Sequence, residues 1–197
     1  MMTEAMEGIE EGIKVGGKLI QDVRFADDQG MIASTEKGLQ KIMDKLNATV
    51  GNFGMKVNTK KTKVMKVSRN VGEEINIMIN GSRIEQVKIL KYIGSTMTED
   101  GRCETEINVR IALAKEAFSK RGELLTKSFR KEVKKKMVKT LVWSTLLYGS
   151  ETWTLRKEDI RRLEAVEMWI WRRMERVSWM DKITNEEILN KVGEKRS

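Results

Sequence analysis

The 197-residue chain contains no histidine, no proline and a single cysteine. Without histidine it cannot build a Ser-His or Cys-His catalytic pair, a histidine-ligated metal centre or a zinc finger. Any chemistry must therefore depend on carboxylates, lysines and a bound metal. One cysteine, Cys103, excludes an intramolecular disulfide and is typical of a reducing compartment, so we expect an intracellular protein of the nucleus or cytoplasm.

Long apolar runs are also missing. No run approaches the roughly 20 residues needed to span a bilayer, and the first residues lack the apolar core of a signal peptide, so we expect no membrane partner. Positive charge, by contrast, is in excess: 38 Lys and Arg against 29 Asp and Glu give a net charge of +9. This balance favours a polyanionic partner, most simply nucleic acid, although a soluble basic protein without such a partner is the plain alternative.

The first half of the chain combines short alternating segments with one amphipathic helix. Short segments at 13–15 and 18–20, each with two apolar residues and one lysine, flank a Gly-Gly pair and predict a hairpin. Ser34 or Thr35 can cap a helix that Gly54 ends. The residues expected on its buried face are Leu39, Ile42, Met43, Leu46, Val50 and Phe53.

Further strands are expected along the rest of this half. An Asn80-Gly81 pair is a strong hairpin signal. The strands are predicted at 55–58, 64–67, 75–79, 84–87 and 89–94. We therefore expect residues 1–101 to form an α+β domain with a helix on one face of an antiparallel sheet.

An acidic pair, Asp27-Asp28, stands at a tight turn between apolar segments. The residues up to Phe25 alternate as in a half-buried strand, residues 31–33 are the expected return strand, and Gly30 is expected to relieve the backbone at the turn. Adjacent carboxylates repel unless a cation lies beside them, and hard oxygen ligands suit Mg²⁺. Asp27 and Asp28 are therefore candidate Mg²⁺ ligands for phosphoryl transfer, with a solvated acidic loop as the alternative.

Beyond Gly101 the pattern becomes helical and predicts an all-α domain over 102–197. Three helices are expected within 107–125, 133–148 and 160–174, and Thr184 can cap a short last one. A basic run opens the second helix. Its lysines could hold phosphates along a duplex without reading sequence, although such a run is usually a solvated face. The lysines proposed for this contact are Lys131, Lys134 and Lys135.

The tryptophans of this half are expected to serve packing rather than base stacking. All five stand at helix-face or helix-end positions, where an indole ring is more often part of a core or its edge. They are Trp143, Trp153, Trp169, Trp171 and Trp179.

Four motifs, spread over nearly the whole chain, resemble those of the reverse transcriptase of non-LTR (LINE-type) retrotransposons and occur in the same order. Arg24-Phe25-Ala26-Asp27-Asp28 looks like the palm hairpin that carries the metal-binding Asp-Asp box. Gly54-Met55-Lys56-Val57-Asn58-Thr59-Lys60-Lys61-Thr62-Lys63 is similar to the palm motif that follows it. Leu90-Lys91-Tyr92-Ile93-Gly94-Ser95 looks like the primer-grip hairpin. Leu146-Leu147-Tyr148-Gly149-Ser150-Glu151-Thr152-Trp153-Thr154, with Arg176-Val177-Ser178-Trp179, resembles the thumb and its downstream segment.

The resemblance implies a role for each motif. Asp27 and Asp28 would hold Mg²⁺ between the primer end and a deoxynucleotide triphosphate, with Phe25 beside the primer. Lys61 would lie near the nucleotide's phosphates, in competition with Lys60 and Lys63. The primer strand would be positioned by Tyr92 and Gly94. The basic helix would lie, as thumb, along the duplex of RNA template and DNA primer.

One departure limits these implications. In the family a further aspartate comes from an upstream palm strand, and no apolar strand bearing an aspartate precedes Asp22 here. We therefore expect a partial palm (1–101) and a thumb-like helical domain (102–197) of an RNA-directed DNA polymerase, inactive as an isolated fragment. A non-catalytic basic nucleic-acid-binding module and a non-functional retroelement relic are the alternatives.

Overall fold

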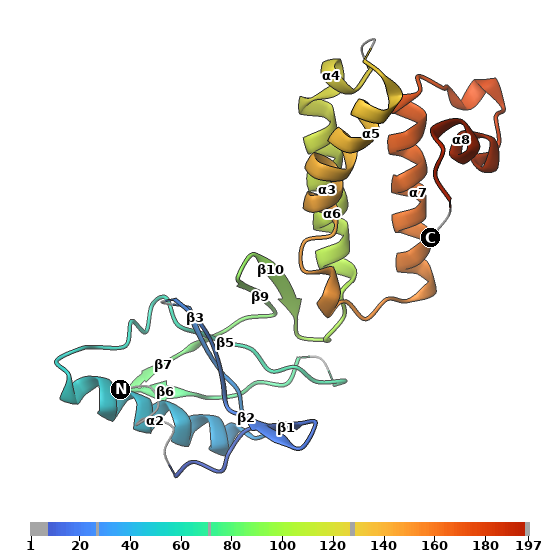
Figure 1. Ribbon diagram of the computed structural model, residues 1–197. Helices are drawn as coiled ribbons and strands as arrows, with labels where there is room; N and C mark the ends of the chain where they lie inside the picture. Colours follow the sequence, from blue (N-terminus) through green and yellow to red (C-terminus); the bar gives the residue numbers. More distant parts are fainter. Residues whose placement is uncertain (1–7, 27, 71, 127–128, 196–197) are drawn as a thin grey trace. The chain divides into compact units, whose positions relative to one another are not determined.

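The computed structural model describes residues 8–26, 28–70, 72–126 and 129–195, and the chain divides into two compact units, 1–101 and 102–197 (Figure 1). The first unit contains short strands and one long helix, and the second is helical, so the chain is mixed α+β. Within the described part of the chain, no helix is long and apolar enough to cross a membrane.

The strands of the first unit form small two-stranded sheets instead of the single antiparallel sheet expected from the sequence. Among the described residues of this unit, four pairs are antiparallel and one, β5 with β8, is parallel. The pairs are β1 (Ile13–Val15) with β2 (Lys18–Ile20), β3 (Asp22–Phe25) with β4 (Asp28–Met31), β5 (Lys63–Val64) with β8 (Glu85–Gln86), β6 (Met78–Ile79) with β7 (Ser82–Arg83), and β9 (Ile89–Tyr92) with β10 (Ser95–Thr98).

Helix α2 (Glu36–Asn52) supplies one side of the core of the first unit. Its N-cap is Thr35, whose hydroxyl accepts a hydrogen bond from the backbone N–H of Gly38 at 3.0 Å. Beyond the helix, Gly54 has φ +71° and ends it as expected. Phe53 is 55% exposed and does not belong to the buried face, because the helix ends one residue before it. The buried core is Ile42, Met43, Leu46, Val50, Val64, Ile75, Ile77, Ile79 and Ile84.

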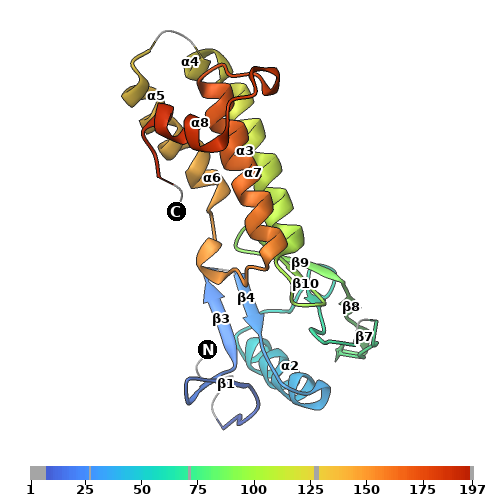
Figure 2. The ribbon, with the colours of Figure 1, turned by 90° about the vertical axis from the view of Figure 1, so that its right-hand side faces the viewer.

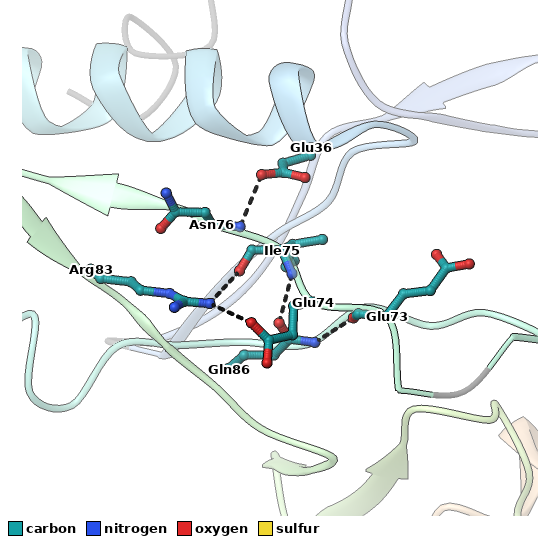
Figure 3. A network of polar contacts seen from close by, with 7 residues as sticks. All are labelled: Glu36, Glu73, Glu74, Ile75, Asn76, Arg83 and Gln86. Carbon is teal, nitrogen blue, oxygen red and sulfur yellow. Dashed lines mark hydrogen bonds and ion pairs between the residues drawn. The ribbon is translucent and has the colours of Figure 1, made fainter.

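Side chains meet several backbone groups of β6 and of the segment before it, where one backbone hydrogen bond, from the Ile84 N–H to the Ile77 carbonyl at 2.8 Å, is also present. The backbone N–H of Ile75 donates to Gln86 Oε1 at 2.8 Å, and that of Asn76 donates to Glu36 Oε1 at 2.9 Å (Figure 3). The amide of Gln40 meets both backbone groups of Met78, accepting from its N–H and donating to its carbonyl, each at 2.8 Å. The expected alternation of buried isoleucines is therefore present, but the ladder covers Met78–Ile79 only.

Other expected strands are absent or shorter than predicted. The strand predicted at 84–87 is reduced to β8 and pairs with β5, because β7 takes the place beside β6, and the strand predicted at 89–94 ends at Tyr92. Residues 55–58 form no strand, and of the strand predicted at 64–67 only β5, shifted to Lys63–Val64, pairs with a neighbour. The Asn80-Gly81 turn is confirmed: both residues have positive φ, +49° and +74°, as a two-residue hairpin turn requires.

The second unit is built on two long helices that lie side by side, α3 (Glu104–Lys120) and α7 (Lys157–Met174) (Figures 1 and 2). The other helices are α4 (Gly122–Thr126), α5 (Lys131–Val138), α6 (Ser144–Leu146) and α8 (Asn185–Val192), with a π-helical turn η1 (Lys139–Trp143) and two 3₁₀ turns, η2 (Ser150–Thr152) and η3 (Trp179–Asp181). Thr184 caps α8 as predicted. The first predicted helix is interrupted after Lys120, so that Leu125 belongs to α4.

A single apolar core holds these helices together. Trp171 belongs to this core and is 1% exposed. Its ring contacts that of Trp143 edge to face, with ring centroids 5.6 Å apart. The buried members are Ala114, Phe118, Leu125, Val138, Val142, Leu146, Val166, Met168, Ile170, Trp171, Met174, Ile188, Leu189 and Val192.

Candidate metal-binding hairpin and nucleic-acid interface

The hairpin β3–β4 carries Asp28 at the start of its second strand. Phe25 pairs with Asp28, so that two residues, Ala26 and Asp27, connect the strands. Ala26 has φ +52°, the backbone that tight hairpin turns use. Asp28 is therefore the first residue of the return strand, which runs over Asp28–Met31 and not over residues 31–33.

Gly30 does not have the role expected at the turn. It lies inside β4 opposite Val23 and has no positive φ. The strand begins earlier than the apolar residues indicate, because backbone pairing with β3 fixes its start at Asp28. The carboxylate of Asp28 thus extends from a strand end, where backbone hydrogen bonds hold its Cα in place.

The side chain of Asp28 is exposed, and Asp27 lies outside the described residues. Asp22 stands opposite Met31, at the other end of β3, and forms an ion pair with Arg24. Three residues of extended chain separate Asp22 from the turn end, about 10 Å, so it cannot share an ion with Asp28. Among the residues that the structure describes, no three His, Cys, Asp or Glu side chains gather as a metal site.

The hairpin β9–β10 contacts the acidic hairpin within the same unit. The hydroxyl of Tyr92, the last residue of β9, donates a hydrogen bond to the carbonyl of Val23 at 3.0 Å. Its ring lies over Gly30, where an added Cβ would sit 3.8 Å from Cε2 of Tyr92. Gly94 lies in the turn and has φ +74°. Two motifs separated by 69 residues are thus joined by a side chain.

The lysines proposed to face nucleotide phosphates differ in their surroundings. Lys61 lies in a turn at 59–61, where its backbone N–H donates to the Asn58 carbonyl at 3.1 Å. Lys60 and Lys61 are exposed, whereas Lys63 forms an ion pair with Glu85 of the neighbouring strand. A lysine held by a carboxylate is less available to a phosphate, so the contacts favour Lys60 and Lys61 over Lys63.

The basic helix α5 makes contacts that its sequence pattern does not indicate. Lys131 Nζ donates to the Lys191 carbonyl at 2.5 Å, and Lys135 Nζ donates to the Gly193 carbonyl at 3.2 Å. Lys135 also lies 3.0 Å from the carboxylate of Glu194. These two lysines hold the end of α8, where carbonyl groups have no partner inside the helix. Lys134 is half-buried.

Trp179 is a residue whose surroundings differ from those expected. Its side chain is 83% exposed, whereas Trp171 is buried and Trp143 and Trp169 pack against the core as predicted. Trp179 opens the 3₁₀ turn η3 after α7 has ended, so no helical face carries its ring into the core. The signal available in the sequence is that charged residues, Glu175 and Arg176, stand at helical spacing before it.

Comparison with known proteins identifies a transposon-derived relative. The chain is 26% identical over 167 residues to an uncharacterized transposon-derived protein of Caenorhabditis elegans. The match covers 82% of this chain and 59% of that protein, so the chain spans less than two thirds of its relative's length. No protein-family profile matches the chain, and no solved structure matches it. The likeness indicates a transposon-related origin.

Proposed function

We propose that the chain derives from the RNA-directed DNA polymerase of a non-LTR retrotransposon, and that by itself it does not synthesise DNA. The observation that carries the proposal is the contact between the two hairpins. The strand that leads to Asp28 is held by Tyr92 of the second hairpin, through a hydrogen bond of 3.0 Å to Val23. In the proposed palm, these are the hairpins that present metal and primer. A transposon-related relative supports the same origin.

The metal would be Mg²⁺, held by Asp28 together with Asp27. Bound Mg²⁺ would stabilise the charge on the attacking and leaving oxygens of phosphoryl transfer. A two-metal site requires carboxylates from more than one strand, and within the described residues no further acidic cluster joins Asp28. This is why we expect the isolated chain to be inactive.

The remaining roles follow from the same proposal. Phe25, whose side chain is 62% exposed, would lie beside the primer, and Tyr92 and Gly94 would position the primer strand. Lys61 would face the phosphates of a deoxynucleotide triphosphate. Residues 1–101 would be a partial palm and residues 102–197 a thumb-like domain against the RNA template and DNA primer.

Binding of Mn²⁺, followed by electron paramagnetic resonance of the free ion, tests the metal site. We expect saturable binding to the full chain that Asp28→Asn abolishes. Asp22→Asn is the matched control, because it removes one carboxylate from the same hairpin at the end where Arg24 neutralises it. If Asp28→Asn binds Mn²⁺ as the unaltered chain does, the hairpin is not a metal site.

Primer extension on an RNA template tests the second half of the proposal. The expected result is no incorporation of nucleotides in Mg²⁺, at enzyme concentrations equal to those of the primer. Incorporation that Asp28→Asn removes would show that the site is complete and that the expectation of inactivity is wrong.

A non-catalytic nucleic-acid-binding module is the second candidate, favoured by the distribution of charge. Residues 102–197 hold 23 Lys and Arg against 15 Asp and Glu, which is +8 of the chain's net charge of +9. Residues 1–101 hold 15 against 14. The positive potential that would attract a polyanion therefore belongs to the helical unit.

A further inference from the structure

Three arginines line a groove where helix α7 ends. The groove has a volume of about 450 Å³, and the part described contains no carboxylate in its lining. Ser119, Thr126 and Ser178 line it together with Arg172, Arg173 and Arg176, and of the three hydroxyls that of Thr126 already donates to the Gly122 carbonyl at 2.6 Å. Guanidinium and hydroxyl donors without a competing acid are the groups that bind phosphate.

The three arginines make different contacts. Arg172 donates to the Ile183 carbonyl at 2.6 Å and to Asn185 Oδ1 at 3.0 Å, and so ties the segment beyond η3 to α7. Arg173 lies over the ring of Trp169, with its Cζ 4.7 Å from the ring centroid. Arg176 is exposed. The charge offered to a ligand therefore comes mainly from Arg173 and Arg176.

Arg176 occupies a backbone position that favours glycine. Its N–H donates to the Arg173 carbonyl and the Val177 N–H donates to the Arg172 carbonyl, which together close the end of α7. Its φ is +56°, in the left-handed region. Glycine adopts this conformation without steric cost, whereas arginine does not. A long, positively charged side chain thus stands at a position whose backbone conformation favours glycine.

An exposed aromatic ring stands three residues further along. Trp179 is 83% exposed, and the turn that carries it is fixed by Ser178, which accepts from the Met180 N–H at 3.2 Å and donates its own N–H to Asp181 at 2.7 Å. The ring is therefore presented to solvent on an ordered turn. The residue before it, Ser178, lines the groove. An exposed indole on an ordered turn that follows a positively charged groove can serve as a stacking platform for a base.

We propose that this groove, together with Trp179, which directly follows Ser178 of its lining, is a binding site for single-stranded nucleic acid. The phosphates would lie against Arg173 and Arg176, and a base would stack on Trp179. A duplex is the poorer ligand, because its bases already stack on one another and offer no free face to the indole. The site uses residues of the second unit and not those of the acidic hairpin, and its binding does not require Mg²⁺. Its test can therefore fail without contradicting the polymerase proposal, and the reverse.

Fluorescence anisotropy of a labelled oligo(U) of about 12 nucleotides, a length that one such site can cover, tests the assignment. The full chain is measured in EDTA, so that the metal site takes no part. We expect Trp179→Ala to weaken binding roughly 5- to 150-fold, the usual effect of removing one stacking partner, and Trp179→Phe to retain most of it. A duplex of equal length should bind more weakly than the single strand.

Arg176→Gly provides a variant whose effect cannot come from a damaged fold. The substitution removes the cation and relieves the left-handed backbone, so its thermal midpoint should equal or exceed that of the unaltered chain. Its affinity should fall, and the slope of log K against log salt should decrease by roughly 0.7 for each single-strand phosphate that Arg176 neutralises in the unaltered chain. Arg161→Ala, an exposed arginine near the other end of α7, is the matched control for charge.

Four outcomes would overturn the proposal. These are the absence of binding to any single strand, equal affinity of Trp179→Ala and the unaltered chain, equal losses in Arg176→Gly and Arg161→Ala, and tighter binding of the duplex. An oligo(dT) of the same length, measured in parallel, tells whether RNA or DNA is preferred.

Discussion

Replacing Lys135 by alanine should destabilise the helical unit, although a lysine run of this kind is usually a solvated face. The Lys135 side chain is 14% exposed, and its ammonium group lies 3.2 Å from the Gly193 carbonyl and 3.0 Å from Glu194. The substitution removes both interactions and the packing of the aliphatic stem. Glu194 keeps its ion pair with Lys139 at 2.8 Å, so its charge is not left alone.

The magnitude follows from these contacts. A hydrogen bond that involves a charged group contributes about 1.5–3 kcal/mol, and exposed ion pairs much less. We therefore expect Lys135→Ala to cost about 1.5–2.5 kcal/mol. Lys134→Ala is the matched control: it makes the same change at the neighbouring position of α5, where the side chain is half-buried and forms no ion pair within the described part of the chain. It should cost less than Lys135→Ala, because only the packing of its stem is lost. The helix propensity terms of the two variants cancel.

Urea unfolding followed by tryptophan fluorescence measures this difference, because all five tryptophans lie within residues 102–197. The pH dependence adds a second test. A hydrogen bond from Lys139, with a further one from Lys135, lowers the pKa of Glu194 below its ordinary value of 4.5. Because the pKa of Glu194 is lower in the folded than in the unfolded chain, its ionised carboxylate stabilises the fold fully above about pH 4.5. This stabilisation is lost as the pH falls through the folded pKa. The difference in free energy of unfolding between Lys134→Ala and Lys135→Ala should therefore become smaller below about pH 4.5. Equal midpoints for Lys134→Ala and Lys135→Ala at neutral pH would refute the reasoning.

Two further predictions concern the first unit. It has no tryptophan, so its unfolding is followed by circular dichroism. Thr35→Ala removes the cap of α2 and should cost about 1 kcal/mol, whereas Ser34→Ala, beside it and outside the cap, should cost nothing measurable; equal losses would argue against the cap. Tyr92→Phe removes the hydrogen bond to Val23 and should cost about 0.5–1.5 kcal/mol. Amide exchange should then accelerate in β3 and β4, and unchanged exchange there would contradict the contact between the hairpins.

Local patterns predicted the elements whose hydrogen bonds close within a few residues. The strands at 13–15 and 18–20, the Thr35 cap, the Asn80-Gly81 turn and the Thr184 cap are all found in the structure. Each of them depends on φ preferences or on a side chain that reaches its own backbone, and both are properties of neighbouring residues. The metal and primer roles of Asp27, Asp28 and Tyr92 stay predictions.

The sequence failed where distant groups decide the outcome. The segment before β6 was expected to pair as a strand, but the side chains of Gln86 and Glu36 accept from its backbone N–H groups at Ile75 and Asn76 instead. An amide side chain can satisfy a buried backbone N–H as well as a strand does, and nothing in the local alternation tells which partner will be nearby.

By itself, the sequence determined the chain's chemistry: no histidine catalysis, no intramolecular disulfide, a net positive charge and the periodicities of its helices. The tertiary structure alone decided which of those charged and aromatic groups face solvent. It turned Lys131 and Lys135 toward the end of α8, placed Trp179 in solvent and put Tyr92 against β3. The reason is that exposure depends on groups brought together from tens of residues apart, whereas propensity and charge belong to each residue and its neighbours.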